Sequence, residues 1–270
     1  MTLLAVWCAE ERLWMASDSR LSGGGGSLID EAVKIFELPV VCRAPSEQSG
    51  FFEDIYFATR LGLGCAGHSL IYQQVQATLL PLLGNLIGRR GAIPAMVDIA
   101  SFVGEVGTQY VRSLGRRRPE DADRVKMLLV GWCPIERRLA AYEVRPEIVG
   151  SMMSFKVLSL DLSDVHFVGD ACAQAQVLYK GISAADQSGA PRSRAPLNVI
   201  RQLIDDATTP TIGGDVQVGF TVGRTFQRVR TGRPIPGREP KAAFWLNAIC
   251  TDDLPQIGPC GLGLMGTVSP

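Results

Sequence analysis

The chain has 270 residues, 46% of them hydrophobic and 20% charged, so it can bury a sizeable core in one large or two small domains. Its 27 Lys and Arg residues balance its 27 Asp and Glu residues, which argues against a nucleic acid or an anionic membrane surface as a partner. No apolar run reaches the roughly 18 residues needed to span a bilayer, and the start of the chain lacks the basic segment of a signal peptide. Seven scattered cysteines without a CxxC pair and only two histidines favour a reducing cytoplasm, with neither a metal site nor a cofactor.

Strands are expected at the start of the chain. Residues 2–7 and 13–19 predict an opening hairpin, because both are apolar and a polar turn separates them. The glycine run at 23–26 predicts a flexible loop, and the strand-like segment 33–38 that follows argues against a phosphate-binding loop, which needs a helix at that point. Residues 55–64 predict another strand.

Two long helices are expected next. Apolar residues recur at helical spacing up to Leu83, with Ser69 as a plausible N-cap. A second apolar stripe predicts a helix over 93–114, with Pro94 in its first turn.

The second half of the chain mixes strands with two shorter helices. Strands are expected at 126–133, 139–144, 155–160, 165–168 and 216–222, and helices at 170–179 and 197–206. After Arg224 the composition turns to Arg, Pro and Gly, with one candidate strand at 244–249. We therefore expect a domain over 1–223 and an irregular extension over 224–270.

This order of elements favours an α+β fold over a doubly wound one, because strands and helices come in runs rather than in βαβα alternation. Two antiparallel sheets sandwiched between helix layers, a four-layer αββα arrangement, would bury all the apolar stripes. The pattern alone does not fix that arrangement.

Thr2 is the first candidate for chemistry. Aminopeptidases remove an initiator methionine when the next side chain is small, so the mature chain is expected to begin with Thr2. Such a residue carries a hydroxyl nucleophile and a free α-amine on one carbon. The amine has a pKa of about 7.7–8.0 and can accept the hydroxyl proton, which a weak nucleophile of this type needs. Threonine at this position is common, so the surroundings must support the assignment.

Asp18 and Lys34 provide that support, because sixteen residues separate Thr2 from Asp18 and sixteen more separate Asp18 from Lys34. A partly buried lysine beside the threonine hydroxyl would favour the alkoxide and disfavour a second positive charge on the amine. The aspartate would hold that lysine by a charge-assisted hydrogen bond. The segment Gly64–His68, just before a predicted helix, can offer backbone N–H groups to an oxyanion.

These motifs together resemble a proteasome β subunit and its bacterial relatives, which are N-terminal-nucleophile hydrolases. The resemblance is carried by Thr2, by Ala-Ser-Asp-Ser-Arg at 16–20, by Val-Lys-Ile at 33–35 and by Gly-Cys-Ala-Gly at 64–67. It covers roughly residues 2–222, is strong up to Trp132 and looser afterwards.

The resemblance implies the αββα fold, stacked rings with active sites facing an inner chamber, and amide hydrolysis through an acyl-enzyme ester. Peptides or unfolded proteins would be the substrates, and the sequence leaves open whether an ATP-dependent unfoldase is a partner. The implied site roles are as follows: Thr2 as nucleophile and base, Lys34 tuning the hydroxyl, Asp18 orienting Lys34, the Gly67 N–H as oxyanion donor, and Cys65 and Ser69 flanking a small, uncharged substrate pocket.

Two positions depart from the family's pattern. Asp170 follows Gly169 where the family has a serine that contacts the terminal amine. A carboxylate there could hold the amine, but it would also raise the pKa of the amine. The family's later Asp-x-x-Ser-Gly segment is matched only by Asp206 and Thr209, with Pro210 in place of the glycine.

Other functions remain open. The turn at Gly67–Ile71 resembles the nucleophile elbow of serine hydrolases, but Ile71 is too large for the fifth position of that motif. Asp170 and the loose segment at Asp206 also fit a catalytically inactive ring or scaffold subunit. A non-protease amidase of the same fold is a third alternative.

Overall fold

The computed structural model describes the chain except for residues 1, 24–25, 116–124, 151, 186–193, 207–208, 235–241, 248, 255–256, 258, 261–264 and 269–270. Within this described part, no helix is long and apolar enough to cross a membrane. All seven cysteines are free; Cys42, Cys65 and Cys133 are buried, whereas Cys8, Cys172 and Cys260 are exposed.

One sheet has eight strands and contains the front of the chain. Its order is β11-β1-β2-β12-β13-β14-β15, and β16 pairs with β13. Its strands are β1 (Leu3–Ala9), β2 (Arg12–Ser17), β11 (His166–Gly169), β12 (Gln217–Val222), β13 (Thr225–Pro234), β14 (Ala242–Leu246), β15 (Ile249–Cys250) and β16 (Gly266–Val268). Because β1 pairs antiparallel with both β2 and β11, the first strand is an inner strand of the sheet.

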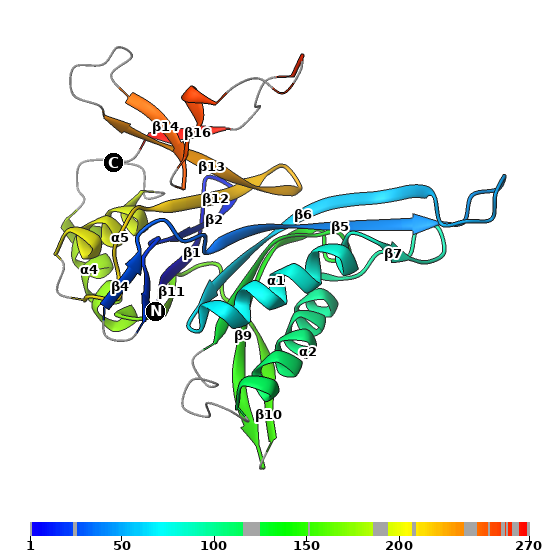
Figure 1. The fold of residues 1–270 in the computed structure, drawn as a ribbon, viewed down its shortest axis with the longest axis horizontal. Coiled ribbons are helices and arrows are strands. Elements are labelled where there is room, and N and C mark those ends of the chain that lie inside the picture. The colour runs from blue at the N-terminus through cyan, green and yellow to red at the C-terminus, as the bar shows by residue number, and fades with distance from the viewer. Residues whose placement is uncertain are drawn as a thin grey trace.

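The second sheet has six strands in the order β10-β9-β8-β6-β5-β7. They are β5 (Ile35–Ala44), β6 (Asp54–Ala66), β7 (Leu86–Ile87), β8 (Lys126–Cys133), β9 (Arg138–Val149) and β10 (Met152–Ser159). The long hairpin of β5 and β6 reaches well beyond the body of the molecule (Figure 1). A separate small hairpin joins β3 (Leu21–Gly23) to β4 (Gly26–Ile29).

Helices lie on the outer sides of the two sheets (Figure 1). Helices α1 (Ser69–Leu83) and α2 (Met96–Gly115) pack on the six-stranded sheet, and α4 (Cys172–Ala185) and α5 (Ala195–Asp206) pack on the eight-stranded sheet. A separate apolar cluster fills the space between the sheets, with members such as Leu4, Met15, Leu128, Val130 and Phe226. The structure is therefore of the mixed α+β class, and the inner faces of its two sheets meet.

The structure corrects several local expectations. Ser69 is the first residue of α1 rather than its N-cap, because His68 occupies the cap position with extended backbone angles. The stretch from Arg224 onward is not irregular throughout, since β13 continues the sheet directly from β12. Only parts of the glycine run are loop: Gly23 and Gly26 are strand residues, and residues 24–25 lie outside the described part.

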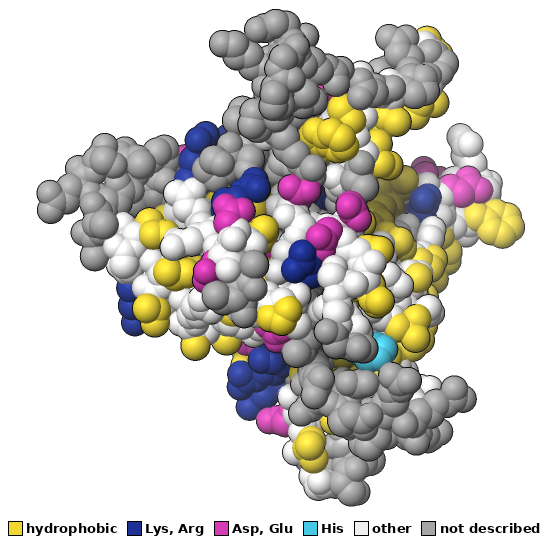
Figure 2. Space-filling view, turned by 60° about the vertical axis from the view of Figure 1, so that its left-hand side comes forward, with side chains coloured by type: hydrophobic (Ala, Val, Ile, Leu, Met, Phe, Trp, Pro, Cys, Tyr) yellow, Lys and Arg dark blue, Asp and Glu magenta, His cyan; other side chains and the backbone are white. Residues whose placement is uncertain are grey.

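Basic and acidic side chains lie interspersed on the face shown in Figure 2. Both signs of charge are therefore visible among the described residues of that face, as expected from the balance of charges in the sequence.

Candidate active site

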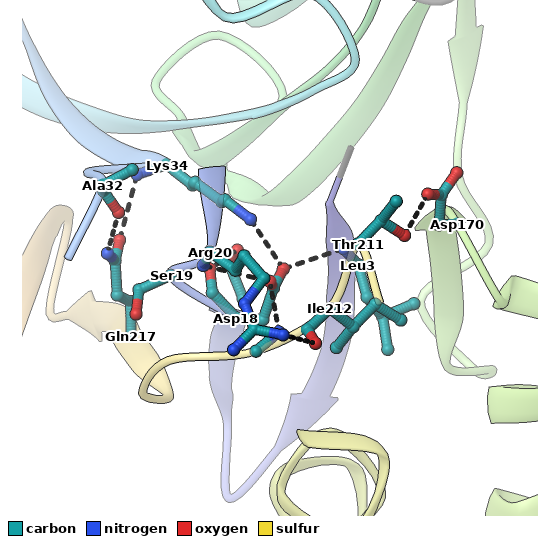
Figure 3. Close-up of polar contacts among 12 residues, drawn as sticks. Leu3, Asp18, Ser19, Arg20, Ala32, Lys34, Asp170, Thr211, Ile212 and Gln217 are labelled. Carbon is teal, nitrogen blue, oxygen red and sulfur yellow. Dashed lines mark hydrogen bonds and ion pairs between the residues drawn. The ribbon is translucent and has the colours of Figure 1, made fainter. Parts of the chain in front are cut away.

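A fully buried carboxylate, that of Asp18, is the centre of the candidate site (Figure 3). Its Oδ1 accepts hydrogen bonds from the Leu3 N–H at 3.0 Å and from the Lys34 Nζ at 2.8 Å. Its Oδ2 accepts from the Arg20 N–H at 3.2 Å and the Gly213 N–H at 3.1 Å. Four donors thus satisfy both oxygens, which is the condition under which a buried charge is tolerated. Asp18 follows the last residue of β2, so strand pairing places it beside β1.

Lys34 enters the site from the residue just before β5, and its side chain has 0% exposure. Its backbone is fixed on both sides: its carbonyl accepts from the Cys65 N–H at 3.0 Å and its N–H donates to Gln217 Oε1 at 3.0 Å. Burial lowers the pKa of the Lys34 ammonium, and the carboxylates of Asp18 and Asp170 oppose that change. The lysine side chain is therefore shielded from solvent, held in one place, paired with Asp18 and within electrostatic reach of Asp170.

Thr2 lies in the interior rather than in solvent, with 2% of its surface exposed. Its carbonyl accepts a hydrogen bond of 2.8 Å from the Asp170 N–H. Gly169 adopts a positive φ of 105°, and a Cβ there would lie 1.9 Å from the Thr2 oxygen, so only glycine permits this close approach. The next residue, Leu3, shares Asp18 Oδ1 with Lys34. Thr2 and Leu3 are thus held between the end of strand β11 and the Lys34–Asp18 pair. Met1 lies outside the described residues.

Asp170, the departure from the family's serine, lies at the end of β11 beside Thr2. Its Oδ2 accepts a hydrogen bond of 2.5 Å from Thr211 Oγ1 (Figure 3). Asp206, expected here as a catalytic residue, is the exposed last residue of α5. The contacts to Asp18 and Asp170 come instead from Gly213 and Thr211, so the catalytic role of Asp206 stays a prediction. The adjacent glycines Gly213 and Gly214 were the sequence signal that could have pointed to this loop, which also contains Thr211.

A surface ion pair ties this loop to the rest of the site. Arg20 Nε lies 2.6 Å from Asp30 Oδ1, and Arg20 also donates to the Ile212 carbonyl at 3.3 Å. The Arg20 guanidinium holds the pKa of Asp30 below its ordinary value. A Cβ on Gly213 would meet the Arg20 guanidinium at 2.2 Å, so the loop and this arginine are in close contact.

Gly67, Cys65 and Ser69 lie at the turn from β6 into α1. Gly67 has a positive φ of 102°. The neighbouring residue Ala66 lies beside Gly169, since a Cβ built on Gly169 would be 3.3 Å from the Ala66 Cβ. Cys65 is fully buried in the core cluster under α1, where burial raises the pKa of its thiol, and Ser69 is half-buried. The turn is thus close to Thr2, while the oxyanion and pocket roles of these residues stay predictions.

The fold thus brings the buried residue Thr2 and the buried Lys34–Asp18 pair into one region of the interior. Within the described ranges, no group of three or more His, Cys, Asp or Glu residues could hold a metal ion.

No model of a known protein family and no curated protein matches this chain. Among solved structures, it is similar to the Gly-1 mutant of Anbu from Hyphomicrobium sp. strain MC1, with 13% identity and a TM-score of 0.58, covering 84% of this chain and 87% of the other. It is also similar to Anbu from Yersinia bercovieri, described as an ancestral β-subunit, with 14% identity and a TM-score of 0.54 over 84% of this chain and 86% of the other. These likenesses support a proteasome-like fold.

Proposed function

We propose that the chain is a threonine-type amide or peptide hydrolase that acts through Thr2 once Met1 is removed, on a four-layer αββα fold. One observation carries this proposal. The backbone N–H of Leu3 and the ammonium of Lys34 bind the same oxygen of Asp18, so the residue before Leu3 is fixed beside the lysine. A threonine nucleophile at that residue would be preorganised near its charged partner, and preorganised geometry is a large part of catalysis.

The reaction begins when the neutral α-amine of Thr2 takes the hydroxyl proton. The hydroxyl oxygen attacks the substrate carbonyl, and the nearby Lys34 ammonium stabilises the developing alkoxide. The Gly67 N–H supplies a hydrogen bond to the oxyanion. The carbon–nitrogen bond then breaks, and the leaving amine takes the proton from the Thr2 ammonium. Water attacks the ester, releases the acid and restores the hydroxyl.

Asp170 gives the proposal a specific feature. Its backbone N–H holds the Thr2 carbonyl and its carboxylate is held by Thr211, so this negative charge has a fixed place near the terminus. A carboxylate near an amine favours the ammonium form. We therefore expect hydrolysis to require a higher pH than a terminus beside a neutral serine would need.

The assembly and setting follow from the same proposal. A self-compartmentalised homo-oligomeric ring in the cytoplasm would act on peptides or unfolded proteins, with an ATP-dependent unfoldase as a partner. Size-exclusion mass several times that of the 29.1 kDa chain is the expected result, and a clean monomer would count against the ring.

A second candidate function is a catalytically inactive ring or scaffold subunit of the same fold. Asp170 favours it, because a carboxylate that keeps the terminal amine protonated removes the base. A non-protease amidase is the close variant of the first proposal, and parallel assays with peptides and small amides separate the two.

The deciding experiment has two parts. Mass spectrometry of the purified protein should show a chain that begins at Thr2, because a retained Met1 leaves no free threonine amine. Thr2→Ser should keep peptidase activity, and Thr2→Val, which has the same shape but no hydroxyl, should lose it with an unchanged melting temperature. Equal turnover of the two variants would remove Thr2 as the nucleophile.

A further inference from the structure

A cavity lies far from Thr2, where the turn between β8 and β9 and the turn between β12 and β13 meet the outer half of β6. Its volume is about 510 Å³, in the range of sites for small molecules. Its lining includes the aromatic residues Tyr56, Phe57 and Trp132 and the basic residues Arg137 and Arg224. Thr59 lines this cavity and lies eight residues before Gly67, which is beside the candidate site. At the usual rise of a strand, that separation along the chain corresponds to roughly 25 Å.

The two arginines of this cavity differ from their neighbours in charge compensation. Nearby, Arg60 pairs with Glu37, Arg90 pairs with Asp54, and Arg138 pairs with Glu136. In the described part of the chain, neither Arg137 nor Arg224 forms an ion pair with a carboxylate. The cavity thus combines aromatic walls with two positive charges that have no carboxylate partner among the described residues.

Arg137 occupies an unfavourable backbone conformation. Its φ is 54°, in the left-handed region that a hairpin turn normally fills with glycine or asparagine. An arginine there is strained relative to a glycine, because its Cβ crowds the backbone. Strain of this kind is more common where a side chain has a function, and here the strained residue contributes to the cavity wall.

Arg224 is held in place by its surroundings. Its carbonyl accepts a hydrogen bond of 2.8 Å from Thr59 Oγ1, and the Thr225 hydroxyl accepts from the Arg60 N–H at 3.1 Å. Its guanidinium lies over the Trp132 ring, 5.6 Å from the ring centre. The charge is therefore presented at the cavity by a fixed turn and an aromatic support.

We propose that this cavity binds a small aromatic carboxylate, with its ring against the Tyr56, Phe57 and Trp132 walls and its carboxylate bound by Arg137 and Arg224. Guanidinium groups match the carboxylate in geometry as well as in charge. Aromatic walls prefer an aromatic body. The inference does not depend on whether Thr2 is catalytic.

The test is calorimetric titration of the full chain with 4-phenylbutyrate. A ligand of this size in such a site should bind with a Kd on the order of 1 mM. The neutral 4-phenylbutyramide and inorganic phosphate, which lack the charge and the apolar body respectively, should each bind at least about tenfold more weakly.

Two variants and a control sharpen the test. Arg224→Gln and Arg137→Gly should each weaken 4-phenylbutyrate binding about tenfold or more, while Arg137→Gly should also raise the melting temperature because it relieves the left-handed strain. Arg138→Gln, whose arginine is adjacent but paired with Glu136, should leave the affinity unchanged. Absence of binding, equal binding of the amide, or equal affinity of all three variants overturns the proposal.

Discussion

Two ion pairs of equal length lie at opposite ends of the β5–β6 hairpin. Lys34 and Asp18 are 2.8 Å apart just before β5, and Arg90 and Asp54 are 2.8 Å apart where β6 begins. The side chains of the first pair have 0% exposure, whereas those of the second have 66% and 40%. The two ion pairs therefore have the same length, but one is buried and the other is exposed. Since Coulomb energy depends on the surrounding dielectric, the attraction within the first pair is much less screened by water than the attraction within the second.

The two ends also differ in how many groups depend on the carboxylate. Asp18 serves four donors, three of them backbone N–H groups from Leu3, Arg20 and Gly213. Asp54 at the exposed end accepts from the Arg90 side chain, which water can replace. The comparison teaches that the buried carboxylate, more than the lysine, holds the candidate site together.

The largest expected effect is therefore that of Asp18→Ala. It should lower the free energy of unfolding by about 3–5 kcal/mol, because it removes the partner of a buried ammonium and leaves three backbone donors without an acceptor. Urea unfolding measures the change. Lys34→Met should be less damaging, because Asp18 keeps its backbone donors. A larger loss for Lys34→Met than for Asp18→Ala would reverse the assignment of roles.

Gly169→Ala should come next. The new Cβ would overlap the Thr2 carbonyl in a backbone conformation that L-residues avoid, for a destabilisation of about 2–4 kcal/mol together with loss of the proposed peptidase activity. Gly50→Ala is the matched control, since its φ of 70° brings the same kind of strain with no neighbour within 4 Å. It should cost only about 1 kcal/mol and leave activity intact. Similar melting temperatures for the two variants would show that the Thr2 contact is unimportant.

The pH dependence should separate activity from stability. Burial lowers the pKa of Lys34, so between that lowered value and the ordinary value of about 10.4 the folded protein binds fewer protons than the unfolded chain. The contribution of this group to the free energy of unfolding therefore rises with pH in that window, by up to about 1.4 kcal/mol per pH unit. Any activity that needs the Lys34 ammonium falls over the same window, by about tenfold per pH unit. Rates and urea midpoints across the window check both signs. If Lys34→Arg retains activity, its alkaline decline should disappear, since arginine stays charged.

The smallest effect is expected at the exposed end. Asp54→Asn should change the free energy of unfolding by less than about 1 kcal/mol, and 0.5 M salt should reduce even that difference. Parallel urea curves with and without salt provide the measurement. A loss comparable to that of Asp18→Ala would mean that burial does not distinguish the two pairs.

Local patterns in the sequence were enough to predict most of the elements. The strand predicted at 126–133 agrees with β8, and the helix predicted to end at Leu83 agrees with α1, because alternation and helical spacing are local signals. Strand β13 was missed, because its Arg, Pro and Gly content indicates irregular chain and only its pairing with β12 makes it a strand. Tertiary pairing overrode local propensity there.

The candidate site was predictable in part. The structure brings Lys34 and Asp18 into contact, as their spacing suggested. Thr211 and Gly213 were missed, because they approach Asp170 and Asp18 from loops far away in the chain and no short motif marks such a contact. Sequence spacing therefore indicated the charged pair, while the backbone groups that complete its surroundings required the fold.

The contact between Asp18 and Gly213 spans 195 residues, and this sets an order of events during synthesis. At about 5–20 residues per second, a ribosome needs roughly 10–40 seconds to proceed from one of these residues to the other. Throughout that interval the Asp18 carboxylate lacks one of the four hydrogen-bond donors that it has in the folded protein. A nucleophile at the front of the chain would thus stay dormant until the rear of the same molecule has been made.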